Sequence, residues 1–169
     1  VQVGIRLNPN TDAKTLSQIS TGKKENKFGV NEKIFYELLK YCKNSKNIDL
    51  KCLSVHIGSQ ILDHRPYERM LNVVSRILNK INYKFDFIDL GGGMGISYGK
   101  ENKKLNYAKY NLAIKKFLKK HNSKIIFEPG RSIVGNTGTL ISKIIYIKKN
   151  EKKDFIILDA AMNDLMRPA

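Results

Sequence analysis

The feature that most constrains the fold of this chain is a regular alternation of short apolar runs with longer amphipathic stretches. Runs of about four to eight apolar residues are typical of buried strands, and apolar residues three or four positions apart are typical of helices. Because a helix-length stretch separates each strand from the next, the pattern predicts parallel strands covered by helices. The expected strands are residues 1–7, 50–57, 85–90 and 124–127, and the expected helices are residues 31–43, 66–81 and 106–120.

Within the first expected helix, Asn31 is a residue type that commonly caps the amino end of a helix. The apolar stripe that we expect to face the core consists of Ile34, Leu38, Leu39 and Tyr41/Cys42. After Arg131 the alternation stops. Residues 139–147 and 155–158 look like two strands joined by a charged turn, which predicts an antiparallel hairpin and the start of an all-β region.

The charge of the chain is strongly positive, with 31 Lys and Arg against 15 Asp and Glu and a formal net charge of +16. Clustered basic residues can indicate nucleic-acid binding. Here 25 of the basic residues are Lys and 6 are Arg, although Arg is favoured for base contacts and bidentate phosphate contacts. Lys is accompanied by an excess of Asn and Ile, which fits a biased codon usage and solvated lysines. We therefore expect no nucleic-acid partner.

Other general features of the sequence bear on membrane partners, metal sites and the cellular compartment. The chain has no apolar run of about 18 residues, so no membrane partner is expected. Its two cysteines, Cys42 and Cys52, fit a reducing compartment, and no metal site is expected. Because it starts directly in a strand-like run and ends without a closing element, we expect it to be a piece of a longer protein. The absence of targeting signals suggests the cytoplasm.

Three unusual clusters lie at the carboxyl ends of expected strands: HIGSQ at 56–60, DLGGGMG at 89–95 and EPGR at 128–131. Ligands of parallel α/β folds gather at the carboxyl ends of the strands. A glycine-rich turn can approach a phosphate, a carboxylate can hold a proton on a ring nitrogen, and an arginine can bind a carboxylate. Taken singly, each has a structural alternative: a buried core histidine, a tight turn, or an ion pair. Together they predict a site for a phosphate-bearing ligand with a ring nitrogen.

These three motifs, together with the segment 159–169, resemble the diaminopimelate decarboxylases. That family belongs to the pyridoxal-phosphate-dependent decarboxylases with an alanine-racemase-like barrel. The resemblance implies an α/β fold: the C-terminal half of a (β/α)8 TIM-type barrel over residues 1–133, then the beginning of a C-terminal β domain over residues 134–169.

The resemblance also implies roles for individual residues. His56 would stack on the pyridine ring, and Glu128 would face the ring nitrogen and keep it protonated, so these two are the expected catalytic residues. Arg131 is expected at both the cofactor and the substrate, and Arg167 at a substrate carboxylate. The residues expected around the cofactor phosphate are Ser59, Gly91, Gly92, Gly93 and Gly130.

The activity implied is decarboxylation of meso-diaminopimelate to L-lysine, the last step of lysine biosynthesis, with pyridoxal 5′-phosphate as cofactor. The lysine that binds this cofactor in the family lies upstream of the matching segment, so this chain alone is expected to be inactive. Family members are typically homodimers. Three alternatives remain: a related decarboxylase acting on ornithine, arginine or carboxynorspermidine, a non-catalytic pyridoxal-phosphate-binding barrel protein, and a nucleic-acid-binding module.

Overall fold

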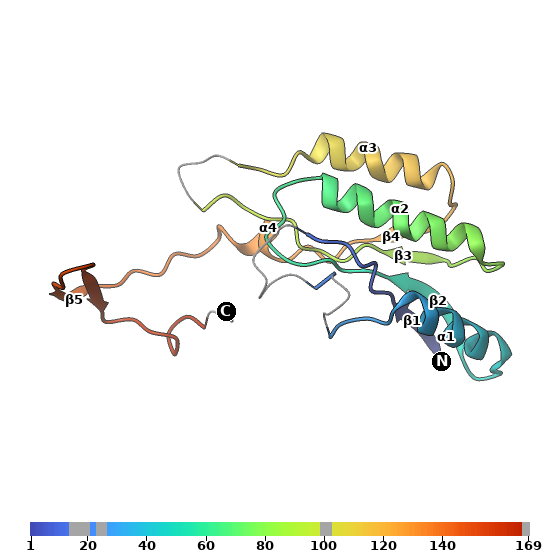
Figure 1. The fold of residues 1–169 in the computed structure, drawn as a ribbon, viewed down its shortest axis with the longest axis horizontal. Coiled ribbons are helices and arrows are strands. Elements are labelled where there is room, and N and C mark those ends of the chain that lie inside the picture. The colour runs from blue at the N-terminus through green and yellow to red at the C-terminus, as the bar shows by residue number, and fades with distance from the viewer. Residues whose placement is uncertain (14–20, 23–26, 99–102, 167–169) are drawn as a thin grey trace. The chain divides into compact units, whose positions relative to one another are not determined.

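The computed structural model describes residues 1–13, 21–22, 27–98 and 103–166. The chain divides into two compact units, residues 1–135 and residues 136–169. In the first unit, four parallel strands lie in the sheet in the order of the sequence (Figure 1). Its elements are β1 (Gln2–Arg6), α1 (Glu32–Asn44), β2 (Asp49–Ser54), α2 (Arg65–Lys80), β3 (Phe87–Asp89), α3 (Tyr107–Leu118), β4 (Lys124–Ile126) and α4 (Arg131–Val134).

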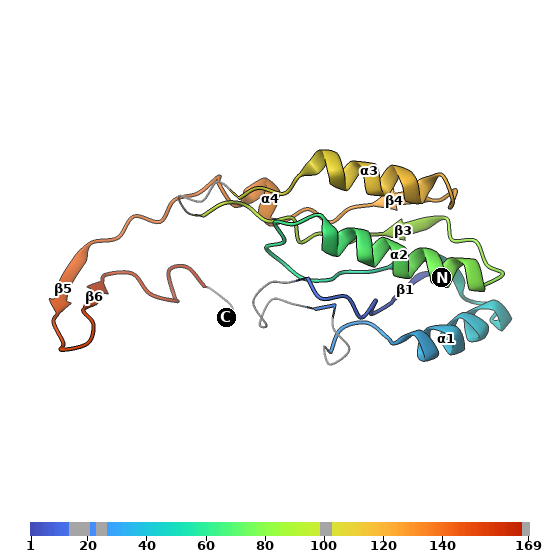
Figure 2. The same cartoon turned by 45° about the horizontal axis from the view of Figure 1, so that its top comes forward.

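The predicted alternation and the parallel pairing are confirmed, and the short helix α4 was not expected. Each connection moves the chain to the next strand in the same direction, which is how consecutive β/α units build a barrel. In both views α2 and α3 lie side by side over the same face of the sheet (Figures 1 and 2). The helices therefore cover one face of the sheet, and its opposite face is the one that lines the interior in a β/α barrel.

Residues 52–57 show how the sequence divides between these two faces. Leu53, Val55 and Ile57 are at most 1% exposed, whereas the alternating residues Cys52, Ser54 and His56 are only partly buried. Because successive side chains of a strand point to opposite faces, the aliphatic set packs under the helices and the polar set faces the interior. Of this set, His56 lies just past the carboxyl end of β2, which is the end of the strands where ligands of barrel folds bind.

Helix α1 begins with a side-chain cap of the kind that the sequence predicts. The side chain of Asn31 accepts a hydrogen bond from the Ile34 amide, which confirms the predicted cap of α1. The predicted stripe of α1 was partly wrong, because Ile34 and Tyr41 are exposed and Phe35 is fully buried. Phe35 contacts Phe85 at 6.3 Å between ring centroids, so α1 packs through a stripe rotated from the expected one.

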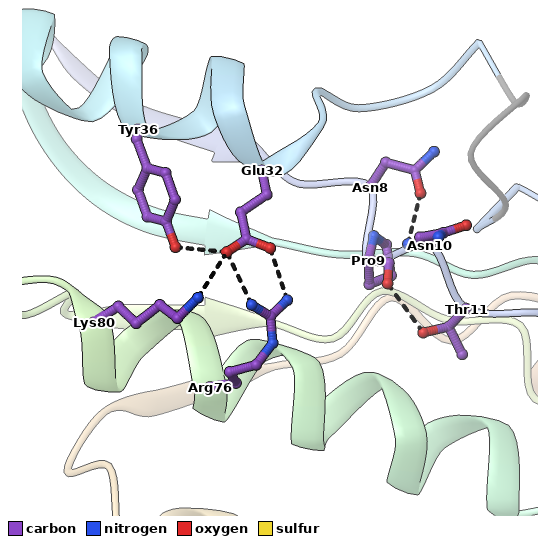
Figure 3. Close-up of polar contacts among 8 residues, drawn as sticks. All are labelled: Asn8, Pro9, Asn10, Thr11, Glu32, Tyr36, Arg76 and Lys80. Atoms are coloured by element: carbon purple, nitrogen blue, oxygen red, sulfur yellow. Dashed lines mark hydrogen bonds and ion pairs between the residues drawn. The ribbon is translucent and has the colours of Figure 1, made fainter.

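A charged cluster centred on Glu32 joins α1 to α2 (Figure 3). Arg76 donates two hydrogen bonds to the Glu32 carboxylate, at 2.9 and 2.7 Å, and the Tyr36 hydroxyl donates a third at 2.7 Å. The ammonium of Lys80 lies 3.6 Å from the same carboxylate. The hydrogen bonds from Arg76, followed by the one from Tyr36, lower the pKa of Glu32 to about 2.

The second unit contains the antiparallel pair β5 (Ile144–Lys148) and β6 (Phe155–Leu158). The predicted hairpin is thus present, although its first strand begins later than residue 139. Within the part of the chain that the structure describes, no helix is both long enough and apolar enough to cross a membrane.

Replacing Glu32 with Gln should lower the free energy of unfolding by about 0.5–1 kcal/mol at pH 7, because the ion pair is partly exposed. The native pKa lies below the unfolded one, so this stabilisation is present above the unfolded pKa and is lost as pH falls toward 2. Urea unfolding of the full-length wild type and variant at several pH values measures the difference. Glu151→Gln, at an exposed residue of the second unit, is the control. A difference that grows on acidification would contradict the assignment.

Candidate active site

The three predicted clusters meet because the strands that carry them are in register. Ser54, Asp89 and Ile126 lie side by side on β2, β3 and β4. His56, Gly91 and Glu128 each follow the aligned residue of their own strand by two positions. Backbone hydrogen bonds continue past the strand ends, from Val55 N–H to the Asp89 carbonyl (2.8 Å) and from Leu90 N–H to the Ile126 carbonyl (3.0 Å).

The glycine run at 91–93 forms a loop that no other residue type could form without displacing its neighbours. Gly91 and Gly93 have φ values of 65° and 87°, in the region that favours glycine. A Cβ on Gly91 would lie 2.6 Å from His56 Nδ1, and one on Gly92 would overlap the carbonyl oxygen of Glu128. The Glu128 amide also donates to the Gly91 carbonyl at 2.9 Å. The loop is therefore enclosed between the residues that follow β2 and those that follow β4.

Asp89 holds the loop from the end of β3. One oxygen of its buried carboxylate accepts a hydrogen bond from the Gly91 amide at 2.8 Å, and the other accepts one from the Ser54 hydroxyl at 3.2 Å. Sequence reasoning quoted Asp89 within its motif but gave it no role. The sequence position of Asp89 could have indicated this role, because a carboxylate at the end of a buried strand needs hydrogen-bond donors.

Tyr67, on the first turn of α2, contacts the loop from the helix layer and was missed entirely. Its hydroxyl donates a hydrogen bond to the Gly92 carbonyl at 3.1 Å. Its ring is fully buried and packs on Tyr110 of α3, with ring centroids 4.4 Å apart. Nothing in the local sequence distinguishes Tyr67 from an ordinary core residue.

His56 accepts a hydrogen bond at Nδ1 from the Gly92 amide, at 3.2 Å. Burial lowers its pKa, and the positive charge of Arg6 lowers it further, against a smaller opposing effect of Asp89. The ring is thus neutral at pH 7. Because Nδ1 is an acceptor, the hydrogen-bond network assigns the proton to Nε2. The site therefore contains a flat, uncharged imidazole in one tautomer.

The remaining predicted residues lie less closely together. The side chain of Glu128 is exposed, and that of Ser59 is partly buried. Gly130 precedes α4 with open space around it, so its environment does not require glycine. Arg131 contacts Tyr98: its guanidinium lies 5.6 Å from the ring centroid and donates to the hydroxyl at 3.1 Å. Arg167 lies outside the described residues.

Replacing Gly91 with Ala should lower the free energy of unfolding by about 2 kcal/mol or more, since the new Cβ meets His56 and the backbone is strained. Gly138→Ala is the matched control, because a Cβ there meets nothing within 4 Å and its φ is not positive. Urea unfolding of the two full-length variants gives the comparison. Equal stability of the two would contradict the geometry of the loop.

Residues 1–135 match the protein family described as pyridoxal-dependent decarboxylase, pyridoxal binding domain. A diaminopimelate decarboxylase of Neisseria meningitidis is 42% identical over 171 residues, which cover 99% of this chain and 41% of that protein. One of Aquifex aeolicus is 41% identical over 173 residues, covering 99% of this chain and 41% of that protein.

Solved structures of diaminopimelate decarboxylases are also similar to this chain. The crystal structure of diaminopimelate decarboxylase from Helicobacter pylori complexed with L-lysine aligns with a TM-score of 0.88 at 42% sequence identity. The alignment covers 99% of this chain and 43% of that one. The chain thus spans less than half the length of the relatives it matches. The prediction of a partial barrel is confirmed. By its sequence over residues 1–135 and by its fold, this chain belongs to the pyridoxal-dependent decarboxylases.

Proposed function

We propose that the full-length protein containing this chain decarboxylates meso-diaminopimelate to L-lysine, with pyridoxal 5′-phosphate as cofactor. The observation that carries this proposal is the glycine loop enclosed between His56 and Glu128, the arrangement that the motifs predict for a phosphate-bearing ring. The named relatives support the choice of substrate, since those at 41–42% identity over almost the whole chain are diaminopimelate decarboxylases.

The residues present fit this cofactor. The loop at 91–93 has no side chains, and a Cβ at any of its three positions would overlap a neighbour, so only backbone faces a ligand there. Backbone N–H groups in such loops bind phosphate oxygens. Gly91, Gly92 and Gly93 would surround the phosphate, and the N–H of Gly93 would donate to it, since the amides of Gly91 and Gly92 already donate to Asp89 and His56. Ser59, Gly130 and Arg131 would complete its surroundings.

The two expected catalytic residues would act on the ring. A neutral His56 can stack on a protonated pyridine without charge repulsion, and its single tautomer holds the imidazole in one orientation. Glu128 would accept a hydrogen bond from the protonated ring nitrogen and stabilise that proton. When bound, pyridoxal phosphate supplies the electron-accepting ring for the electron pair left when the α-carboxylate departs as CO2.

The substrate would be held by its charges. Diaminopimelate carries two carboxylates and two amines, so at least one carboxylate lies away from the reacting carbon. Arginine binds carboxylates through two parallel hydrogen bonds. Arg131 and Arg167 are the proposed carboxylate partners; in this structure the guanidinium of Arg131 donates to the hydroxyl of Tyr98.

Three further expectations belong to this proposal. Residues 1–133 would be the C-terminal half of the barrel, and residues 134–169 would begin the β domain. The full-length protein would be a homodimer, as is typical of the family. It would act in the cytoplasm.

The full-length protein, loaded with pyridoxal phosphate, should release CO2 from meso-diaminopimelate with a kcat/KM at least about 100-fold above that for ornithine, arginine or carboxynorspermidine. The reason is that an arginine arranged for a second carboxylate is left unpaired by substrates that lack one. CO2 release with each amino acid at equal concentration measures this. Preference for ornithine or arginine would replace the proposed substrate, and binding of the cofactor without any turnover would favour a non-catalytic barrel protein.

Replacing Glu128 with Gln should lower kcat by about 100-fold while changing the affinity for pyridoxal phosphate little, since the phosphate contacts remain. Turnover and cofactor titration of the same full-length preparation separate the two effects. Glu151→Gln is the control for removal of one negative charge. Parallel losses of turnover and cofactor affinity would count against a role at the ring nitrogen.

A further inference from the structure

The contact between Tyr67 and the glycine loop has a geometry that a packing role alone does not require. Tyr67 is 0% exposed, so its hydroxyl has little access to water, and burial raises its pKa well above the usual value. The hydroxyl therefore stays protonated and acts as a donor. Its acceptor, at 3.1 Å, is the carbonyl of Gly92, which lies 25 residues later in the sequence.

This hydrogen bond fixes the orientation of one peptide group. The peptide between Gly92 and Gly93 is trans, as are all those described. In a trans peptide the carbonyl and the N–H point in opposite directions. With the Gly92 carbonyl held toward Tyr67 of α2, the N–H of Gly93 points away from this helix. Among the described residues, the Gly93 amide has no hydrogen-bond acceptor.

Two glycines flanking this peptide would otherwise permit it to rotate. Gly93 has a φ of 87°, and neither Gly92 nor Gly93 has a side chain that would resist a flip of the peptide. A flip would turn the carbonyl oxygen, a negative dipole end, toward the position of an anionic ligand. A single buried donor on one side of the peptide opposes that flip.

We propose that Tyr67 is a positioning residue for the cofactor phosphate: through the Gly92 carbonyl it holds the Gly93 N–H toward the phosphate of pyridoxal phosphate. This inference rests on the proposed function. It adds to the cofactor site a residue that lies in the outer helix layer. Tyr67 does not touch the cofactor. It acts through the peptide group that does.

Tyr110 supplies a matched control within the same ring pair. It is also buried and packs against Tyr67 at 4.4 Å between centroids. Its hydroxyl, however, has no hydrogen-bond partner among the described residues. Removing that hydroxyl therefore changes the packing of the pair as little as removing the one on Tyr67, but leaves the loop untouched.

The test compares two ligands on the full-length protein: pyridoxal phosphate, and pyridoxal, which has the same ring and aldehyde but no phosphate. Tyr67→Phe should weaken binding of pyridoxal phosphate about ten-fold, the usual effect of losing one buried hydrogen bond, and leave pyridoxal binding unchanged. Tyr110→Phe should change neither. Dissociation constants come from absorbance or fluorescence titration of the apoprotein.

Each outcome of these titrations either supports or overturns the positioning role of Tyr67. Unchanged binding of pyridoxal phosphate in Tyr67→Phe, or equal weakening of both ligands, would overturn the positioning role in favour of a purely structural one. If the wild type does not bind pyridoxal phosphate, the proposed function itself fails. If Tyr67→Phe does not fold, 3-fluorotyrosine at position 67 keeps the ring and strengthens the donor. It should bind pyridoxal phosphate at least as tightly as the wild type, and a selective loss would overturn the proposal.

Discussion

The backbone pairing of β2, β3 and β4 is the constraint on which the candidate site depends. Their register aligns Ser54 with Asp89 and Asp89 with Ile126, and two further residues along each strand bring His56, Gly91 and Glu128 together. A slip of one residue in any strand would exchange its two faces. The side chains that now face the interior would then lie under the helices. The buried aliphatic residues of the outer face, such as Leu53 and Ile88, oppose such a slip because it would expose them.

The loop after β3 is held by hydrogen bonds from several directions. Asp89 accepts from its first amide, His56 accepts from its second, and Tyr67 donates to the carbonyl of Gly92. Glycine provides the positive φ values and the close approach, but it also makes the loop intrinsically flexible. Fixed polar partners remove that flexibility before a ligand binds, which reduces the entropy lost on binding.

Much of this arrangement follows from patterns in the sequence. The apolar alternation indicated parallel strands and helices, the cap at Asn31 was correct, and the motifs were placed at the ends of adjacent strands. The stripe of α1 was partly wrong because several phases of a short amphipathic helix bury similar numbers of apolar residues, and the packing against Phe85 selected the one through Phe35. The role of Tyr67 could not be predicted, since its partner is 25 residues away and is selected by the packing of α2 on β3.

The hairpin of the second unit has consequences for handling the protein. All its large apolar side chains are exposed on both of its faces: Ile144, Ile145, Tyr146, Ile147, Phe155, Ile156, Ile157 and Leu158. A two-stranded sheet of this composition presents free edges to any other strand, and such edges pair with copies of themselves. Expressed without further polypeptide to cover these residues, the segment is expected to self-associate. Charged substitutions on the outer strand positions are the natural remedy during production.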